Sequence, residues 1–203
     1  MIQKVDVIDG DNSFVFAEIF QELVRDTIMS MPTKKTPGHH KEGMNAIKAC
    51  LPSILPVITN LFNASLSSGC FPRHWKLAEV LAHPKDGDYE VAGNNRHISL
   101  LPVLSKVLER IGHVQLVSFL TPNTDLLSLH QSGNRRCHST ETLGVLFTSH
   151  LYKAYKAIDE KKVTAVLMLD LSKAFDNINH QKLLIKLRSL RCGSSMVRQL
   201  SDR

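Results

Sequence analysis

The sequence predicts a mixed α/β (α+β) fold that combines several amphipathic helices with a few strands. Apolar residues recur at helical spacing in several separate stretches. One continuous β-prone run, Val163–Leu169, is typical of a strand buried on both faces. Hydrophobic residues make up 43% of the 203 residues, which is enough to build a core and argues against disorder.

Two helices are predicted in the first third of the chain. Phe14–Ser30 is amphipathic. Ser53–Ser68 has apolar residues near helical spacing, with Pro56 in its first turn and Gly69 as a natural stop. The basic loop between them, 31–43, is interpreted either as a solvated connection or as a phosphate contact.

The middle of the chain predicts a strand, a turn and a helix. Leu77–Ala82 is the strand and Pro84–Asp88 is the turn. Pro102 begins the clearest helix, which Pro122 ends. The apolar stripe of this helix comprises Leu104, Val107, Leu108, Ile111, Val114 and Val117.

Two more helices are predicted further along the chain. Ser139 and Thr140 are suitable caps for the first. Its expected buried face comprises Leu143, Leu146, Phe147, Leu151, Ala154 and Ile158. His180–Leu190 is the second helix, and the last dozen residues show no packing pattern.

Charge and composition narrow the classes of function only slightly. The chain has 25 Lys and Arg against 19 Asp and Glu, a formal charge of +6, which suits a nucleic-acid partner and many other proteins equally. Its four cysteines include no C-x-x-C pair, so a zinc site is not expected. The first residues do not resemble a signal peptide, and no apolar run reaches membrane-spanning length. We therefore expect an intracellular protein, in cytoplasm or nucleus, with no membrane partner.

Asp170 is the sharpest candidate for chemistry. It directly follows the predicted strand Val163–Leu169, and strand ends in α/β sheets hold side chains in fixed, accessible positions. A carboxylate held there suits Mg²⁺, which prefers oxygen ligands. The alternative is that Asp170 only caps the following turn.

Five sequence blocks resemble, in order and in spacing, those of reverse transcriptases of the non-LTR retrotransposon type (LINE or jockey-like). The blocks are Phe71–Lys76, Pro84–Asp88, Arg96–Pro102 with Leu104–Arg110, Gln131–Arg135 with Ser139–Glu141, and Asp170–Asp176. The chain is thereby identified as a truncated piece of such an RNA-directed DNA polymerase.

The resemblance implies roles for the residues around Asp170. Asp170 matches the catalytic, metal-binding carboxylate, and the backbone of Leu171 would lie beside the same metal. Phe175 matches the bulky residue that excludes a 2′-hydroxyl, and Lys173 and Ala174 share its nucleotide-binding block. Taken alone, Phe175 would be interpreted as a core aromatic.

The resemblance also implies nucleic-acid contacts outside that block. Lys85 and Arg96 match basic residues that hold the incoming triphosphate, although either alone would be interpreted as a solvated surface charge. Gln131, Gly133 and Arg135 match a segment that lies near the template.

By the same resemblance the chain divides into three parts. Residues 1–30 form a helical lead-in, 31–160 a fingers-like region and 161–203 the start of a palm. The family's reaction is nucleotidyl transfer from deoxynucleoside triphosphates onto a DNA primer along an RNA template, with Mg²⁺. The oligomeric state of the chain stays open.

Two features lead us to expect no polymerase activity from this chain alone. Two-metal displacement needs more than one carboxylate, and the sequence has no Asp-Asp pair. Several fingers positions also depart from the family pattern, among them His83, Asn95, His97 and Asn134. The alternatives are a non-catalytic nucleic-acid-binding remnant or an unstable pseudogene product.

Overall fold

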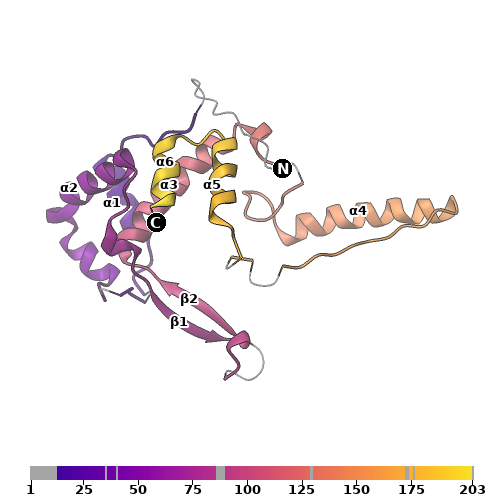
Figure 1. Cartoon of the computed structure of the whole chain (residues 1–203), viewed down its shortest axis with the longest axis horizontal. Coiled ribbons are helices and arrows are strands. Elements are labelled where there is room, and N and C mark those ends of the chain that lie inside the picture. Colours follow the sequence, from indigo (N-terminus) through magenta and orange to yellow (C-terminus); the bar gives the residue numbers. More distant parts are fainter. Residues whose placement is uncertain are drawn as a thin grey trace. The chain divides into compact units, whose positions relative to one another are not determined.

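A computed structural model of the chain divides into two compact units, Met1–Phe119 with His180–Arg203, and Leu120–Asn179. Figure 1 labels the helices and strands of both units. The residues described are 13–34, 36–39, 41–85, 90–128, 130–171, 174–175 and 177–202.

The first unit contains helices and a small antiparallel sheet. The helices are α1 (Gln21–Ser30), α2 (Met44–Ser68), α3 (Val103–Leu120), α5 (His180–Ser189) and α6 (Ser194–Ser201). The two strands are β1 (Glu79–Pro84) and β2 (Asn95–Leu100), and short 3-10 turns span Arg73–Lys76 and Ala92–Asn94. The predicted mixture of helix and strand is therefore confirmed at this coarse level.

The main core lies where α1, α2 and α3 pack together. Its fully buried side chains include Val24, Ile28, Phe62, Val107 and Ile111. The predicted stripe of α3 is buried at its start, whereas Val114 and Val117 are exposed.

The segment before α1 is extended, so the helix predicted from Phe14 begins only at Gln21. Two side-chain amides satisfy its backbone in place of helical hydrogen bonds. The Asn63 amide accepts from the Ile19 N–H at 2.8 Å and donates to the Ile19 carbonyl at 2.9 Å. Gln115 makes the same pair of bonds with Ala17 at 2.9 and 3.2 Å. Because these donors and acceptors come from distant helices, local periodicity could not predict this conformation.

Helix α2 is longer than predicted and contains Pro52 and Pro56 in its interior rather than in its first turn. It ends as predicted at Gly69, whose φ of 69° is left-handed. By length and composition alone, α2 is the one described helix that could cross a membrane, because residues 44–52 extend it beyond the predicted start. Core helices of soluble proteins meet the same test, and α2 contributes buried side chains to the core.

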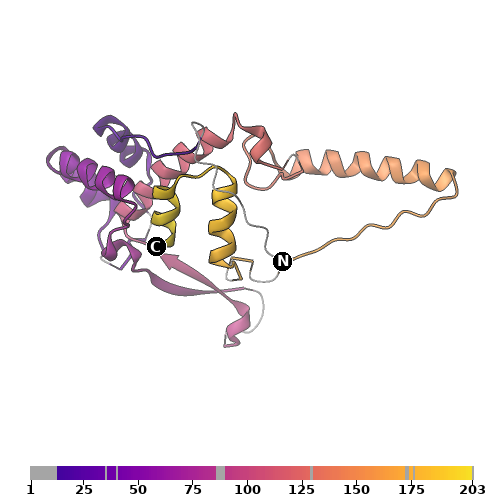
Figure 2. The same ribbon diagram turned by 45° about the horizontal axis from the view of Figure 1, so that its top comes forward.

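The C-terminal residues form helix α6, which the sequence did not predict. Met196 and Val197 are buried in a second cluster with Phe14 and Cys192, and burial raises the pKa of the Cys192 thiol to about 11. Figure 2 shows α6 and α5 side by side, as their contacts require. At eight residues, α6 is shorter than the stretch over which an apolar period is counted along a sequence, which explains why the prediction was wrong here.

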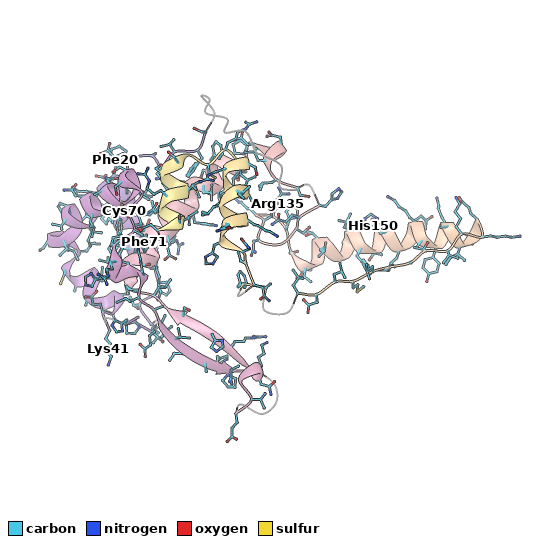
Figure 3. All side chains as sticks on the ribbon, in the orientation of Figure 1. Phe20, Lys41, Cys70, Phe71, Arg135 and His150 are labelled. Atoms are coloured by element: carbon cyan, nitrogen blue, oxygen red, sulfur yellow. The ribbon has the colours of Figure 1, made fainter. Side chains whose placement is uncertain are left out.

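Asp202 fixes the end of α6 to the loop after α2. Its carboxylate accepts from the Phe71 N–H at 2.9 Å and pairs with the Lys76 ammonium at 2.9 Å. These two interactions, with the Lys76 hydrogen bond the larger, lower the pKa of the Asp202 carboxyl. Phe71, whose N–H makes this contact, is labelled in Figure 3.

The second unit is dominated by α4 (Thr140–Asp159). The predicted cap is confirmed, because Ser139 and Thr142 form a reciprocal capping box. The predicted buried face is wrong: no residue of α4 is buried, and Leu146 and Ile158 are 48% and 60% exposed. A helix buries its apolar stripe only against a second layer, and no described helix or strand of this unit supplies one.

The predicted buried strand Val163–Leu169 is also wrong in this structure. The segment is extended but lies in no sheet, and Val163, Leu167 and Leu169 are 96%, 81% and 82% exposed. A strand needs hydrogen-bonded neighbours, and the described residues provide none for this segment.

Candidate nucleic-acid interface

The β1–β2 hairpin carries the two predicted triphosphate contacts, Lys85 and Arg96. Both figures of the ribbon show the hairpin projecting from the helices of its own unit (Figures 1 and 2). Arg96 lies on β2 directly across from His83. Lys85 follows β1, and its N–H donates to the Asn94 carbonyl at 2.7 Å, which extends the ladder by one residue.

Strand geometry places these basic groups on one face. Residues directly opposite in an antiparallel pair share a face, and residues two apart on one strand do so too. His83, Arg96 and Lys85 are therefore neighbours at the far end of the hairpin, and all three are exposed. We call these three residues the hairpin basic cluster.

The hairpin basic cluster has the electrostatic character of a phosphate-binding surface. Among the described residues, neither Lys85 nor Arg96 forms an ion pair. Two fixed cations and an imidazole within one strand pair would attract a polyanion. The sequence predicted Lys85 and Arg96, but it missed His83, which only the pairing of His83 with Arg96 reveals.

The predicted template-contact residues form a loop before α4 in the second unit. The Gln131 side-chain amide donates to the Gly133 carbonyl at 3.3 Å, and the Arg135 guanidinium donates to the Gln131 carbonyl at 3.4 Å. The structure thus brings these three residues together, and Figure 3 labels the exposed Arg135. Whether they contact a template stays a prediction.

The predicted catalytic segment lies in the same unit, after the extended run. Asp170, Leu171, Ala174 and Phe175 are exposed, with Phe175 at 87%. Lys173 lies outside the described residues. Phe175 is therefore not a core aromatic in this structure.

The described residues do not by themselves fit a two-metal centre. They contain no group of three or more His, Cys, Asp or Glu side chains placed to share an ion. Asp170 supplies one carboxylate, whereas two ions about 4 Å apart need several oxygen ligands.

An apolar cavity of about 410 Å³ lies elsewhere in the first unit. Side chains of α3, α5 and α6 line it, among them Leu108, Leu116, Leu187 and Met196. None of the predicted site residues reaches it. The candidate interface of this unit is thus the exposed hairpin and not an enclosed pocket.

Comparison with known sequences defines the class of protein to which this hairpin and carboxylate segment belong. A sequence model described as "Reverse transcriptase (RNA-dependent DNA polymerase)" matches residues 83–201. The match includes the hairpin basic cluster, the Gln131–Arg135 loop and Asp170. The chain belongs to the reverse transcriptase family.

The individual relatives are polymerases from mobile elements. The chain is 32% identical over 170 residues to the probable RNA-directed DNA polymerase from transposon BS of Drosophila melanogaster. It is 32% identical over 166 residues to the corresponding protein from transposon X-element, and 29% identical over 180 residues to the polymerase from mobile element jockey, both from the same fly. These alignments cover 83%, 81% and 88% of this chain. The predicted resemblance to non-LTR retrotransposon polymerases is therefore confirmed.

The relatives are much longer than this chain. The alignments span only 18%, 18% and 19% of the three relatives.

Proposed function

We propose that this chain contributes a phosphate-binding hairpin and one catalytic carboxylate to RNA-directed DNA synthesis. In this proposal the hairpin basic cluster binds the phosphates of a nucleic acid or an incoming deoxynucleoside triphosphate. Phosphoryl transfer depends largely on positioning and charge neutralisation, which basic side chains on a rigid strand pair can provide. Asp170 supplies one ligand for Mg²⁺, and Phe175 packs under the sugar.

One observation carries the proposal. Arg96 and His83 are directly paired across the hairpin, Lys85 extends the same ladder, and all three fall within the residues that match the reverse transcriptase family. Isolated surface cations occur on most proteins, whereas a paired, exposed set at one hairpin end concentrates positive charge on one face, which supports phosphate binding there.

Binding to a primed RNA template tests this surface. We expect the 203-residue chain to bind it at low salt, with log Kd rising linearly with log salt because bound counterions are released. The double variant K85A/R96A should reduce the salt slope by about 2, since each lost phosphate contact reduces it by about 1. Fluorescence anisotropy over a salt series measures the slope.

The matched control removes the same charge from elsewhere in the first unit. R25A/R188A deletes two exposed cations from α1 and α5. The proposal is contradicted when the control lowers the slope as much as K85A/R96A does, because binding is then a property of net charge.

Primer extension tests the catalytic half of the proposal. We expect no extension by this chain with Mg²⁺ and deoxynucleoside triphosphates, because Asp170 alone cannot hold two ions. Extension by the wild-type chain that Asp170→Ala abolishes would show that the chain assembles a complete site, and would overturn this expectation.

A further inference from the structure

We propose that His83 is a proton-dependent phosphate ligand of the hairpin basic cluster, which adds its positive charge only when its imidazole is protonated. Phosphate binding by the hairpin then strengthens as the pH falls. This proposal rests on the proposed function, because it concerns the same surface. It goes further by naming the residue that makes binding there depend on pH.

The first observation is the position of His83 beside two cations. His83 lies directly opposite Arg96 in the β1–β2 ladder, and the Cβ atoms of opposite residues are about 5 Å apart. Lys85 is two residues further along the chain, on the same face and about 7 Å away. Both strands of the hairpin belong to this chain, so the three side chains are brought together by its own strand pairing.

The second observation is that the charged groups on this face are mainly basic. From β2, the charged side chain that faces His83 is Arg96. On the strand of His83 itself, Lys85 follows and Glu79 precedes it on the same face. Glu79 is four residues back, about 13 Å along the strand. A phosphate drawn to Arg96 and Lys85 therefore arrives next to the imidazole.

The remaining acidic groups of the hairpin lie outside its two strands. Glu90 precedes the turn Ala92–Asn94, and Asp86 and Asp88 are outside the described residues. No ion pair or side-chain hydrogen bond joins His83 to another described residue. Within the described part of the chain, the imidazole is thus available to a phosphate oxygen.

Histidine suits this role because its ordinary change of charge falls between about pH 5 and pH 8. A phosphate beside an imidazole stabilises the protonated form. By linkage, the protonated form binds phosphate more tightly by the same factor. The sign follows directly: the added attraction is present at low pH, and it is lost as the pH rises and the imidazole gives up its proton.

Binding of the whole chain to a primed RNA template at about pH 6 and about pH 8 tests the proposal. Fluorescence anisotropy should show binding about two- to fivefold tighter at the lower pH, the range of one exposed ion pair. The salt slope should be larger there by about 1, as for one additional phosphate contact.

Two substitutions of His83 separate charge from shape. His83→Gln keeps a hydrogen-bonding side chain that cannot take up a proton, so it should lose both the tighter binding and the larger salt slope at low pH. His83→Lys is charged at both pH values. It should therefore bind the template at the higher pH as tightly as the wild-type chain does at the lower pH.

His97→Gln is the matched control on the same hairpin. His97 pairs with Ala82, and alternation along the strand places it on the face opposite to His83. Its removal should leave the pH dependence of the wild-type chain unchanged. The contribution of His83 is then distinguished from that of histidines elsewhere in the chain.

A labelled deoxynucleoside triphosphate in place of the template identifies the source of the phosphate. A pH difference that His83→Gln removes supports the proposal with either probe. When it appears with the triphosphate alone, the ligand is the incoming nucleotide. When it appears with the template alone, the ligand is the nucleic-acid backbone.

The proposal is overturned when His83→Gln keeps the wild-type pH difference with both probes, or when His97→Gln removes as much of it. If K85A/R96A still lowers the salt slope and R25A/R188A does not, the proposed function survives that result and only the role of His83 fails. A chain that binds neither probe at either pH contradicts both.

Discussion

At the scale of single residues, a few side chains and glycines set the conformation of the first unit. Asn63 and Gln115 hold the segment before α1 extended by bonding its backbone on both sides. Gly38 allows a loop to pass directly over the chain that follows the hairpin. A Cβ at Gly38 would lie 2.5 Å from the backbone of Leu101. Backbone atoms cannot yield as a flexible side chain can, so this position needs glycine.

Gly38→Ala should therefore destabilise the chain by about 1–3 kcal/mol through overpacking. Urea denaturation measures the change in the free energy of unfolding. Gly93→Ala is the control, because nothing lies within 4 Å of its Cβ, and it should change stability by less than about 0.5 kcal/mol. Equal effects of the two substitutions would contradict the close approach at Leu101.

At the scale of elements, local signals predicted helix ends better than they predicted burial. The left-handed Gly69 and the capping residue Ser139 act on their own neighbours, so sequence alone located them. The extended segment 14–20 depends on Asn63 and Gln115, which are remote in sequence. The exposure of α4 and of 163–169 depends on whether a second layer covers them, which local signals also do not encode. Lys85 and Arg96 were predicted as site residues only through resemblance to a family, and their shared face follows from the strand register.

The docking of α6 through Asp202 should depend on pH. Because the Lys76 and Phe71 hydrogen bonds lower the pKa of this carboxyl in the folded chain, the stabilisation is present above the ordinary aspartate pKa. It is lost as the pH falls through the lowered value. Asp202→Asn should thus have a lower urea midpoint than wild type near neutral pH. The difference between the two midpoints should shrink as the solution is acidified.

Asp26→Asn serves as the comparison, since Asp26 pairs with exposed Arg25 on α1 at 3.3 Å, and an exposed pair of this kind should show a smaller effect. A wild-type minus Asp202→Asn difference that stays constant down to acidic pH would mean that the carboxylate charge does not hold α6.

At the scale of the whole molecule, the chain consists of two units with different degrees of burial. The unit with α2 and α3 has a continuous core, whereas α4 and the following segment leave their apolar side chains exposed. The predicted division into lead-in, fingers-like and palm parts stays a prediction. Family membership applies to both units, because the matched residues 83–201 run through both.

In the function proposed for this chain, the hairpin basic cluster is the surface of the first unit that binds nucleic-acid phosphates. Lysine acetylation followed by mass spectrometry, with and without a primed RNA template at low salt, tests it most directly. We predict that the template protects Lys85, while exposed Lys186 on α5 keeps its rate of modification. Equal rates at Lys85 with and without bound template would contradict phosphate binding by the hairpin basic cluster.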